Sequence, residues 1–121
     1  MRSKVEWTGG TSMVATNEAG QPLELDWKQG PSPMQIALQA VGACSLVDVV
    51  IGMKERPLEA AWVELDSTRA ETTPRRFTGF SMTYHIRGDV PLKLAERIVA
   101  KSHEKFCSVS HSMAKDITTT R

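Results

Sequence analysis

Two cysteines, Cys44 and Cys107, are the residues of this chain whose type is best suited to chemistry. A cysteine thiolate is a nucleophile, and a second thiol can trap the sulfenic acid that forms when the first is oxidised. The two cysteines are far apart in the sequence, so they can pair only if the fold brings their Cα atoms within about 7 Å. Neither belongs to a Cys-x-x-Cys motif, which excludes a thioredoxin-type motif and a four-cysteine zinc site.

Two histidines accompany the second cysteine. His103, Cys107 and His111 recur at every fourth position, so they would share one face if the segment is helical. An imidazolium there would favour the thiolate. The same three residues could instead bind zinc, with Cys44 or a carboxylate as the fourth ligand, but no second short ligand pair supports a zinc site. We therefore predict that His111 supports the thiols and that the protein holds neither a metal nor a cofactor.

Asp48 lies one helical turn after Cys44, on the same predicted face. An ionised carboxylate close to the thiol would oppose formation of the thiolate. The structural interpretation is that a buried carboxylate needs an ion-pair or hydrogen-bond partner, such as an arginine of a partner chain. Asp48 is thus a candidate supporting residue whose role is left open.

The segment that must position Cys44 is a long apolar run, and its punctuation predicts a helix over residues 33–53. Ser32 suits the N-cap, Pro33 suits the first helical position, and Pro57 cannot continue a helix. Apolar residues cover nearly every side, which predicts a helix buried on all sides. Because one sheet can cover only one face, we predict an intimate homodimer in which a second subunit covers the rest.

A membrane span is the competing interpretation of the same run. Gln35, Gln39 and Asp48 interrupt it, and the uninterrupted apolar stretches are shorter than the ~18–20 residues that a bilayer needs. Asp48 would lie inside the hydrocarbon at a cost of about 2.5–3.5 kcal/mol. We therefore predict a core helix and no membrane contact.

The rest of the chain alternates between strand and helix patterns. Period-two alternation and turn residues predict three strands before the helix, two after it, and one at the end. A second helix is expected from Pro91 to about Lys105, followed by a short helical turn. The predicted strands are 4–8, 12–16, 23–27, 62–70, 80–87 and 116–120. This order predicts an α+β fold with a mostly antiparallel sheet, as a single domain over residues 1–121.

Composition bounds the environment. The chain is 40% hydrophobic and 24% charged, which is typical of a globular protein and excludes disorder. Its net charge of +1 is interspersed, which predicts no nucleic-acid partner. The first residues lack the apolar core of a secretory signal, so we predict a cytoplasmic protein.

Three stretches together resemble the OsmC/Ohr family, the osmotically inducible and organic hydroperoxide resistance proteins. The first is Ser32-Pro33-Met34-Gln35-Ile36 leading through Gly42-Ala43-Cys44 into the apolar helix. The second runs from Pro74-Arg75-Arg76-Phe77 to Ile86-Arg87-Gly88, and the third is Cys107-Ser108-Val109-Ser110, similar to the family's Cys-Pro-Val-Ser. The resemblance covers essentially the whole chain and keeps the order and spacing of these landmarks.

The resemblance implies an OsmC-like fold in an intertwined homodimer, with the two thiols meeting at the subunit interface. It implies that Cys44 attacks the peroxide bond of an organic hydroperoxide and that Cys107 resolves the sulfenic acid as a disulfide. An external dithiol, lipoyl-type in one branch, would then reduce the disulfide. The implied function is a thiol peroxidase or related redox protein in oxidative stress defence.

The sequence departs from the peroxidase branches at two helper positions. Those branches place an activating arginine after a Gly-Gly in the first hairpin, where this chain has Thr11, and a glutamate after the helix-opening proline, where it has Met34. The resemblance is thus to a less characterised OsmC-like branch. Arg69, Arg75 and Arg76 are candidate substitute cations. The alternative function is a non-catalytic OsmC-like dimer that binds a small apolar or thiol-reactive ligand.

Overall fold

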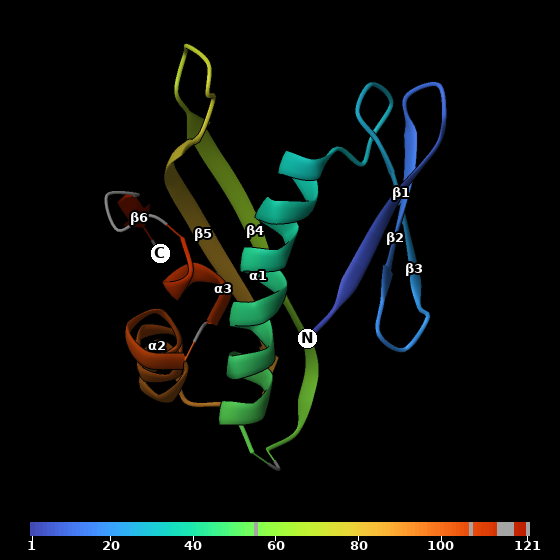
Figure 1. Ribbon diagram of the computed structural model, residues 1–121. Helices are drawn as coiled ribbons and strands as arrows, with labels where there is room; N and C mark the ends of the chain where they lie inside the picture. The colour runs from blue at the N-terminus through green and yellow to red at the C-terminus, as the bar shows by residue number, and fades with distance from the viewer. Residues whose placement is uncertain (55, 107, 114–117, 121) are drawn as a thin grey trace. The chain divides into compact units, whose positions relative to one another are not determined.

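A computed structural model describes residues 1–54, 56–106, 108–113 and 118–120 of the 121-residue chain, with residues 105, 106 and 118–120 described through their backbone. The predicted Cys107 site lies outside the described residues. The chain divides into two compact units, Met1–Ala37 and Leu38–Arg121. Figure 1 shows their helices and strands.

The first unit is a three-stranded antiparallel meander. β1 (Ser3–Gly9) pairs with β2 (Ser12–Asn17), which pairs with β3 (Pro22–Asp26). Gly9 and Gly10 have positive φ angles of 117° and 57°, and the tight turn between β1 and β2 depends on that freedom.

One face of this small sheet is apolar. The register places Trp7 opposite Met13 and Val5 opposite Ala15, with residues of β3 completing each row. Alternation along a strand sends these side chains to the same face. Trp7 is 67% exposed and Val5 62% exposed, so the first unit by itself does not cover this apolar face. Its six members are Val5, Trp7, Met13, Ala15, Leu23 and Leu25.

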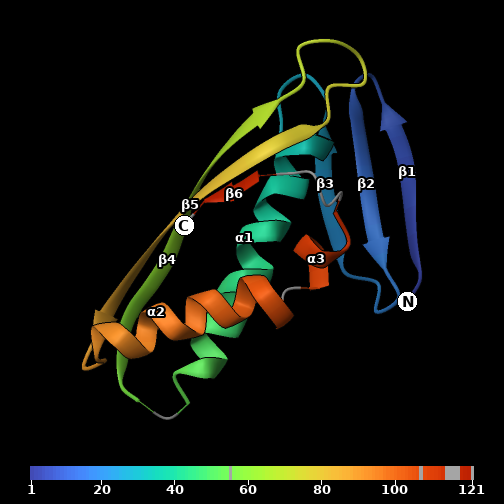
Figure 2. The ribbon, with the colours of Figure 1, turned by 90° about the vertical axis from the view of Figure 1, so that its left-hand side faces the viewer.

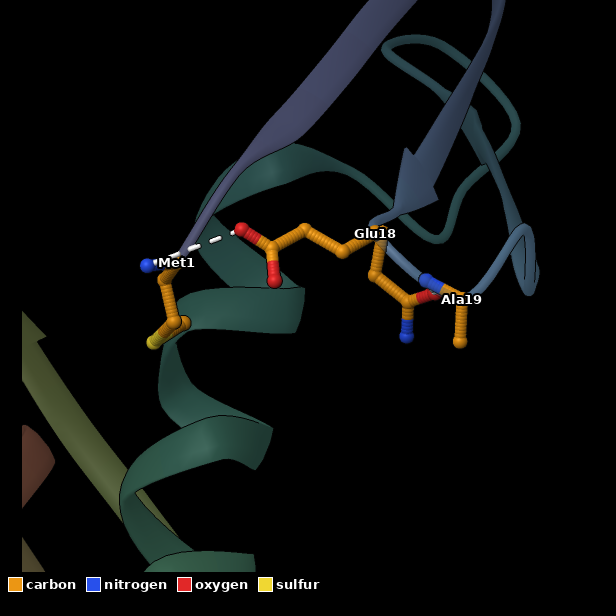
Figure 3. Close-up of polar contacts among 4 residues, drawn as sticks. Met1, Glu18 and Ala19 are labelled. Atoms are coloured by element: carbon orange, nitrogen blue, oxygen red, sulfur yellow. Dashed lines mark hydrogen bonds and ion pairs between the residues drawn. The ribbon is translucent and has the colours of Figure 1, made fainter.

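An exposed ion pair joins the N-terminus of the first unit to the turn after β2. Figure 3 shows the N-terminal ammonium of Met1, which lies 3.6 Å from Glu18 Oε1, and the backbone N–H of Ala19, which donates to the side chain of Asn17. The ion-paired groups of Met1 and Glu18 are both exposed. Exposed ion pairs contribute about 0–1 kcal/mol, so this contact is a minor local feature.

A capping box starts the long helix α1 (Pro33–Gly52). The backbone N–H of Gln35 donates to Ser32 Oγ at 3.2 Å, and Gln35 Oε1 accepts from the backbone N–H of Ser32 at 2.9 Å. The two bonds satisfy donors that a helix start otherwise leaves without partners. The predicted N-cap at Ser32 and first helical position at Pro33 are confirmed.

In the second unit, α1 buries one side and exposes another. Val41, Gly42, Ser45 and Val49 are buried, whereas apolar residues on the opposite side are exposed. The exposed fractions are 54% for Val47, 44% for Val50 and 69% for Ile51. Burial on every side, as the sequence predicts, would therefore require cover from outside the second unit.

Within the described part of the chain, α1 is the one helix with the length and apolarity that crossing a membrane would require. Core helices of water-soluble proteins have the same properties. Asp48, in its second half, accepts a hydrogen bond from Ser102 within the domain. The helix is thus a packed element of a small α+β domain rather than a membrane span.

The sheet of the second unit is built on a long hairpin. β4 (Leu58–Arg69) and β5 (Phe77–Gly88) are antiparallel, and β6 (Thr118–Thr120) adds to β5 in parallel. Phe80 and Met82 of β5 are buried, and β4 alternates between half-buried and exposed residues. Figures 1 and 2 show α1 running alongside this hairpin, in the direction opposite to β4.

The chain then turns back through three short helical elements. They are α2 (Leu92–Lys101), the π-helical segment η1 (Ser102–Phe106) and α3 (Ser108–His111). Val49 of α1 and Met53, which directly follows α1, pack with Val99 of α2 in a hydrophobic core cluster. The α+β class and the mostly antiparallel strand pairing are thus as predicted, but the strands form two sheets where the sequence predicts one. The predicted strand at 62–70 begins earlier, at Leu58. The predicted start of the last strand, at 116 and 117, lies outside the described residues.

Candidate functional site

Cys44 lies on α1 as a half-buried free cysteine. Its neighbour Ser45 is fully buried and lies about 100° further around the helix axis than Cys44. Gly42 lets α1 approach the sheet closely, because a Cβ at that position would lie 2.5 Å from Leu65 Cδ1. The helix face that includes Gly42 and Ser45 is therefore fixed by packing, and this fixes the direction in which the thiol projects.

A chain of four hydrogen bonds runs from α1 through the interior of the second unit. Ser102 Oγ donates to Asp48 Oδ2 at 2.9 Å, and Ser102 Oγ lies 3.0 Å from Ser45 Oγ. Ser45 Oγ is also hydrogen-bonded to the hydroxyl of Tyr84, whose oxygen lies 2.7 Å from Nε2 of His103. We call this set the polar relay; in order, its members are Asp48, Ser102, Ser45, Tyr84 and His103.

The polar relay joins three elements of the fold. Ser45 and Asp48 come from α1, Tyr84 from β5, and Ser102 and His103 from the start of η1. Ser45 and Ser102 are fully buried, where a hydroxyl without a partner would cost about 1–3 kcal/mol. No buried side-chain nitrogen or oxygen of the described residues lacks a partner. The π-helical turn is itself a feature that is frequent at functional sites.

The predicted supporting role of Asp48 takes a specific form here. Burial predicts that this carboxylate has a partner, for example an arginine of a partner chain. The partner in the structure is the Ser102 hydroxyl, supplied by the same chain. Asp48 is therefore part of the polar relay, whose third member, Ser45, directly follows Cys44 in the sequence.

The predicted roles of Cys107 and His111 stay predictions. Cys107 lies outside the described residues, so the structure tests neither its pairing with Cys44 nor the His103–Cys107–His111 zinc alternative. His111 ends the four-residue helix α3 and is exposed. Among the described residues, no group of three or more His, Cys, Asp or Glu side chains could hold a metal ion.

The three candidate arginines bind carbonyl groups of the loop between β4 and β5 and of the first residue of β5. Arg69 Nε donates to the carbonyl of Arg75 at 2.9 Å, and Arg75 Nε donates to the carbonyl of Ala70 at 3.3 Å. Arg76 Nη1 donates to the carbonyl of Phe77 at 3.4 Å. These contacts tie the arginines to the hairpin loop.

This loop lies away from Cys44 within the second unit. Gly42 meets Leu65 of β4, and Arg69 lies four residues further along that strand, about 13 Å at a rise of ~3.3 Å per residue. Because α1 and β4 run in opposite directions, Cys44 lies on the side of Gly42 that faces away from the loop (Figure 1). The chain by itself therefore does not bring Arg69, and the loop that follows it, to the thiol.

Thr11 stands where the resemblance places the activating arginine, and it has a structural role in the first unit. Its hydroxyl donates to Asp26 Oδ1 at 2.7 Å, and Ser12 Oγ donates to Asp26 Oδ2 at 3.1 Å. The backbone N–H groups of Lys28 and Gln29 donate to the same carboxylate. Hydrogen bonds from Gln29 first, then from Thr11 and Lys28, lower the pKa of Asp26 to about 2, because they favour the charged form.

A partly open cavity of about 600 Å³ lies between β5 and α2. Its lining is mainly apolar, with Ile86, Val90 and Val99 among the contributing residues. Tyr84 is also part of the lining, and Glu96 and Thr83 add polar groups. Such a volume is in the range of small-molecule sites.

Most of the polar relay is not apparent from the sequence pattern. Ser102 continues the apolar side of the predicted second helix and Tyr84 lies in the apolar row of the predicted strand 80–87, so neither stands out, nor does Ser45. The available signal was the occurrence of three hydroxyl side chains at positions whose neighbours in the pattern are apolar and predicted to be buried. Buried polar groups need partners, so three on facing elements predict a shared network.

These features define an OsmC-like α+β fold whose cysteine helix packs against a long hairpin and is tied to it by a polar relay. The sequence profile of the OsmC-like protein family matches residues 26–120. Protein YhfA of Escherichia coli K12 is 32% identical over 126 residues, which cover 99% of this chain and 94% of that protein. The chain therefore belongs to the OsmC-like family.

Solved structures agree with this assignment. A hypothetical protein from Aquifex aeolicus VF5 is 25% identical, with a TM-score of 0.82 over 98% of this chain and 92% of that one. An organic hydroperoxide resistance protein OsmC, a predicted redox protein from Legionella pneumophila, is 23% identical, with a TM-score of 0.68 over the same shares of the two chains. The second likeness shows the fold alone.

Proposed function

We propose that this protein is a thiol-based peroxidase that reduces organic hydroperoxides through Cys44 and Cys107. The observation that carries the proposal is the placement of Cys44, a half-buried thiol on α1 whose direction is set by the packing of Gly42 and Ser45, within a chain of the OsmC-like family. The Legionella neighbour, which shares the fold, is described as an organic hydroperoxide resistance protein, and we propose the same class of substrate here. The setting is oxidative stress defence in the cytoplasm.

The proposed cycle has three balanced steps. The Cys44 thiolate attacks the terminal oxygen of ROOH, so that an S–O bond forms, the O–O bond breaks and the leaving alkoxide takes a proton to become ROH. The Cys107 thiol then displaces water from the Cys44 sulfenic acid and forms a disulfide. An external dithiol, such as a lipoyl dithiol, restores both thiols by exchange and leaves as its own disulfide. The cycle needs no cofactor or metal.

We further propose that the working form is a homodimer. Two apolar faces lack cover within the unit that carries each: that of the β1–β3 sheet, and the side of α1 that carries Val47, Val50 and Ile51. Contiguous exposed apolar surfaces of this kind mark association sites. A second copy offers the same two faces, and a two-fold axis lets each face be buried in both subunits at once.

The proposed activity is tested by following the consumption of an organic hydroperoxide in the presence of a dithiol reductant. We expect turnover with the parent protein and none with Cys44→Ser. A parent protein that consumes no hydroperoxide above the rate of the reductant alone would contradict the proposal. Comparing a lipoyl dithiol with a monothiol identifies the reductant class.

The cavity between β5 and α2 favours a second candidate function, the binding of a small apolar ligand without catalysis. The two functions differ in their dependence on the thiol. A binding protein would retain its ligand affinity after Cys44→Ser, whereas the peroxidase would lose turnover. Val90 lines the cavity, so a Val90→Trp substitution would fill it, abolish ligand binding and leave the thiol in place.

A further inference from the structure

Four residues of α2 line the cavity between β5 and α2, and they lie on one side of that helix. At about 100° per residue, an arc of roughly 100° around the helix axis contains Leu92, Ala95, Glu96 and Val99. Three of them are apolar, and Glu96 lies at one edge of the arc. The side of α2 that faces the cavity is therefore apolar, with a single carboxylate.

The cations of α2 lie on another side of the helix. They recur at every fourth position, at Lys93, Arg97 and Lys101. The same step per residue places them about 60° to 140° beyond Glu96 around the axis, on the side away from Val99. None of the three is among the described residues that line the cavity. Glu96 is thus the one charged side chain in the described lining.

The carboxylate of Glu96 can accept hydrogen bonds from a ligand. Glu96 is exposed, and no group within the described ranges forms an ion pair or hydrogen bond with it, although Lys93 lies three positions earlier. The hydroxyl of Tyr84, in contrast, is engaged in the polar relay. Alternation along β5 sends the side chains of Thr83 and Arg87 to the face of the sheet opposite Tyr84. Because a carboxylate can only accept, a polar group that binds Glu96 must donate.

The rest of the lining is an apolar floor that continues into the core of the second unit. Ile86, Val90 and Ala95 pack against the core cluster that contains Val99. Close packing on one side fixes the shape of this floor. With a volume of about 600 Å³, the cavity has room for the apolar body of a small molecule, and its acidic group lies at the exposed rim.

We propose that this cavity binds small amphipathic amines, molecules with an apolar body and an ammonium group. The inference rests on the second candidate function, the binding of a small ligand, and is independent of the thiol. The apolar body lies on the floor, and the ammonium group donates to Glu96 at the rim. An ammonium group at the rim keeps contact with water, so binding avoids the cost of burying a charge. A carboxylate ligand has no hydrogen to donate and is repelled by Glu96.

The first test is a titration of the full chain, followed by methyl NMR, with three probes of similar shape: 4-phenylbutylamine, 4-phenylbutan-1-ol and 4-phenylbutanoate. We expect the amine to shift the methyl signals of Ile86, Val90 and Val99. It should bind about three- to fivefold more tightly than the alcohol, as an exposed ion pair allows, and the carboxylate should bind most weakly. Cys44→Ser should leave all three affinities unchanged. An amine that shifts only methyl signals outside the cavity would overturn the inference.

The second test removes the charge of the rim. Glu96→Gln changes an exposed side chain, so the fold should be retained, and we expect the affinity for the amine to fall to that for the alcohol. The matched control is Glu104→Gln, which removes an exposed carboxylate outside the described lining and should keep the preference for the amine. An unchanged preference in Glu96→Gln would overturn the role of Glu96.

The outcomes for the parent protein separate the inference from the function on which it rests. Equal affinities for the three probes would overturn the inference and leave the binding of small apolar ligands in place. If no probe binds, both the inference and the second candidate function fail. The peroxidase proposal is decided separately, by the consumption of hydroperoxide.

Discussion

The phenol oxygen of Tyr84 lies 2.7 Å from Nε2 of His103, and this contact joins the sheet of the second unit to the π-helical turn that follows α2. From Tyr84 the hydrogen bonds continue to Ser45, the residue next to Cys44. A histidine far along the chain is thereby coupled to the helix that carries the candidate nucleophile. The polar relay thus connects α1, β5 and η1 next to the candidate nucleophile.

The buried hydroxyl of Ser102 should contribute measurably to stability. Ser102→Ala removes its bonds to Asp48 and Ser45 and leaves their polar atoms in the interior, so we expect a loss of about 1–3 kcal/mol in the free energy of unfolding. Denaturant unfolding followed by circular dichroism measures it. Ser112→Ala is the matched control, because Ser112 is exposed and donates only to a backbone carbonyl. Equal effects of the two substitutions would contradict the account.

Asp26 should give the first unit a defined sensitivity to acid. Its pKa is about 2 in the folded protein, below the usual 3.8, so ionised Asp26 stabilises the folded state fully above pH 3.8. This contribution is lost as the pH falls through about 2. We expect the stability difference between the parent and Asp26→Asn to shrink over that range, as measured by unfolding at a series of pH values. Glu24→Gln on the same strand should show no such change.

Gly88 should tolerate no side chain. Its φ is +150°, and a Cβ would lie 2.5 Å from the carbonyl oxygen of Pro57 and 3.2 Å from Leu58 Cα, both backbone atoms. We expect Gly88→Ala to lower stability by about 2–5 kcal/mol, from strain and overpacking together. Gly20→Ala isolates the strain, since Gly20 has a φ of +80° and open space around it, and should cost about 1–2 kcal/mol. Thermal unfolding of both variants tests the difference.

The proposed dimer should depend on the exposed side of α1. Val47→Asp places a charge where the proposed partner covers an apolar surface, so we expect the dimer to dissociate to monomer in sedimentation equilibrium. Leu92→Asp makes the same kind of change at another residue, 73% exposed on α2, and should leave the assembly intact. A parent protein that is monomeric at high concentration would contradict the dimer.

The order of elements follows from the sequence because each signal is local. The capping box at Ser32 and the alternation from Phe80 to Ile86 are set by residues within a few positions of one another. The polar relay is different, because it depends on which hydroxyls of α1, β5 and η1 come to face one another. Ser102 occupies an apolar position of its helix, and only the packing of α1 beside that helix reveals its partners.

The supporting residues of the thiol show the same limit. The need of Asp48 for a partner is predictable from burial, but its identity, Ser102, depends on tertiary packing. The arginines at 69, 75 and 76 look suitable by charge, whereas in the structure their guanidinium groups bind carbonyls of the hairpin loop and of the start of β5. Charge can be read from a sequence, but the distance to a thiol cannot.

The most direct test of the central claim is intact-mass analysis of the reduced protein after one equivalent of an organic hydroperoxide. We expect the parent to lose two hydrogens within seconds, as a disulfide forms, and Cys107→Ser to accumulate a sulfenic acid that a diketone reagent traps. Cys44→Ser should show neither change. Two thiols that stay free to alkylate after many minutes with the hydroperoxide would contradict the peroxidase account, and Cys44 would then be a packing residue of α1.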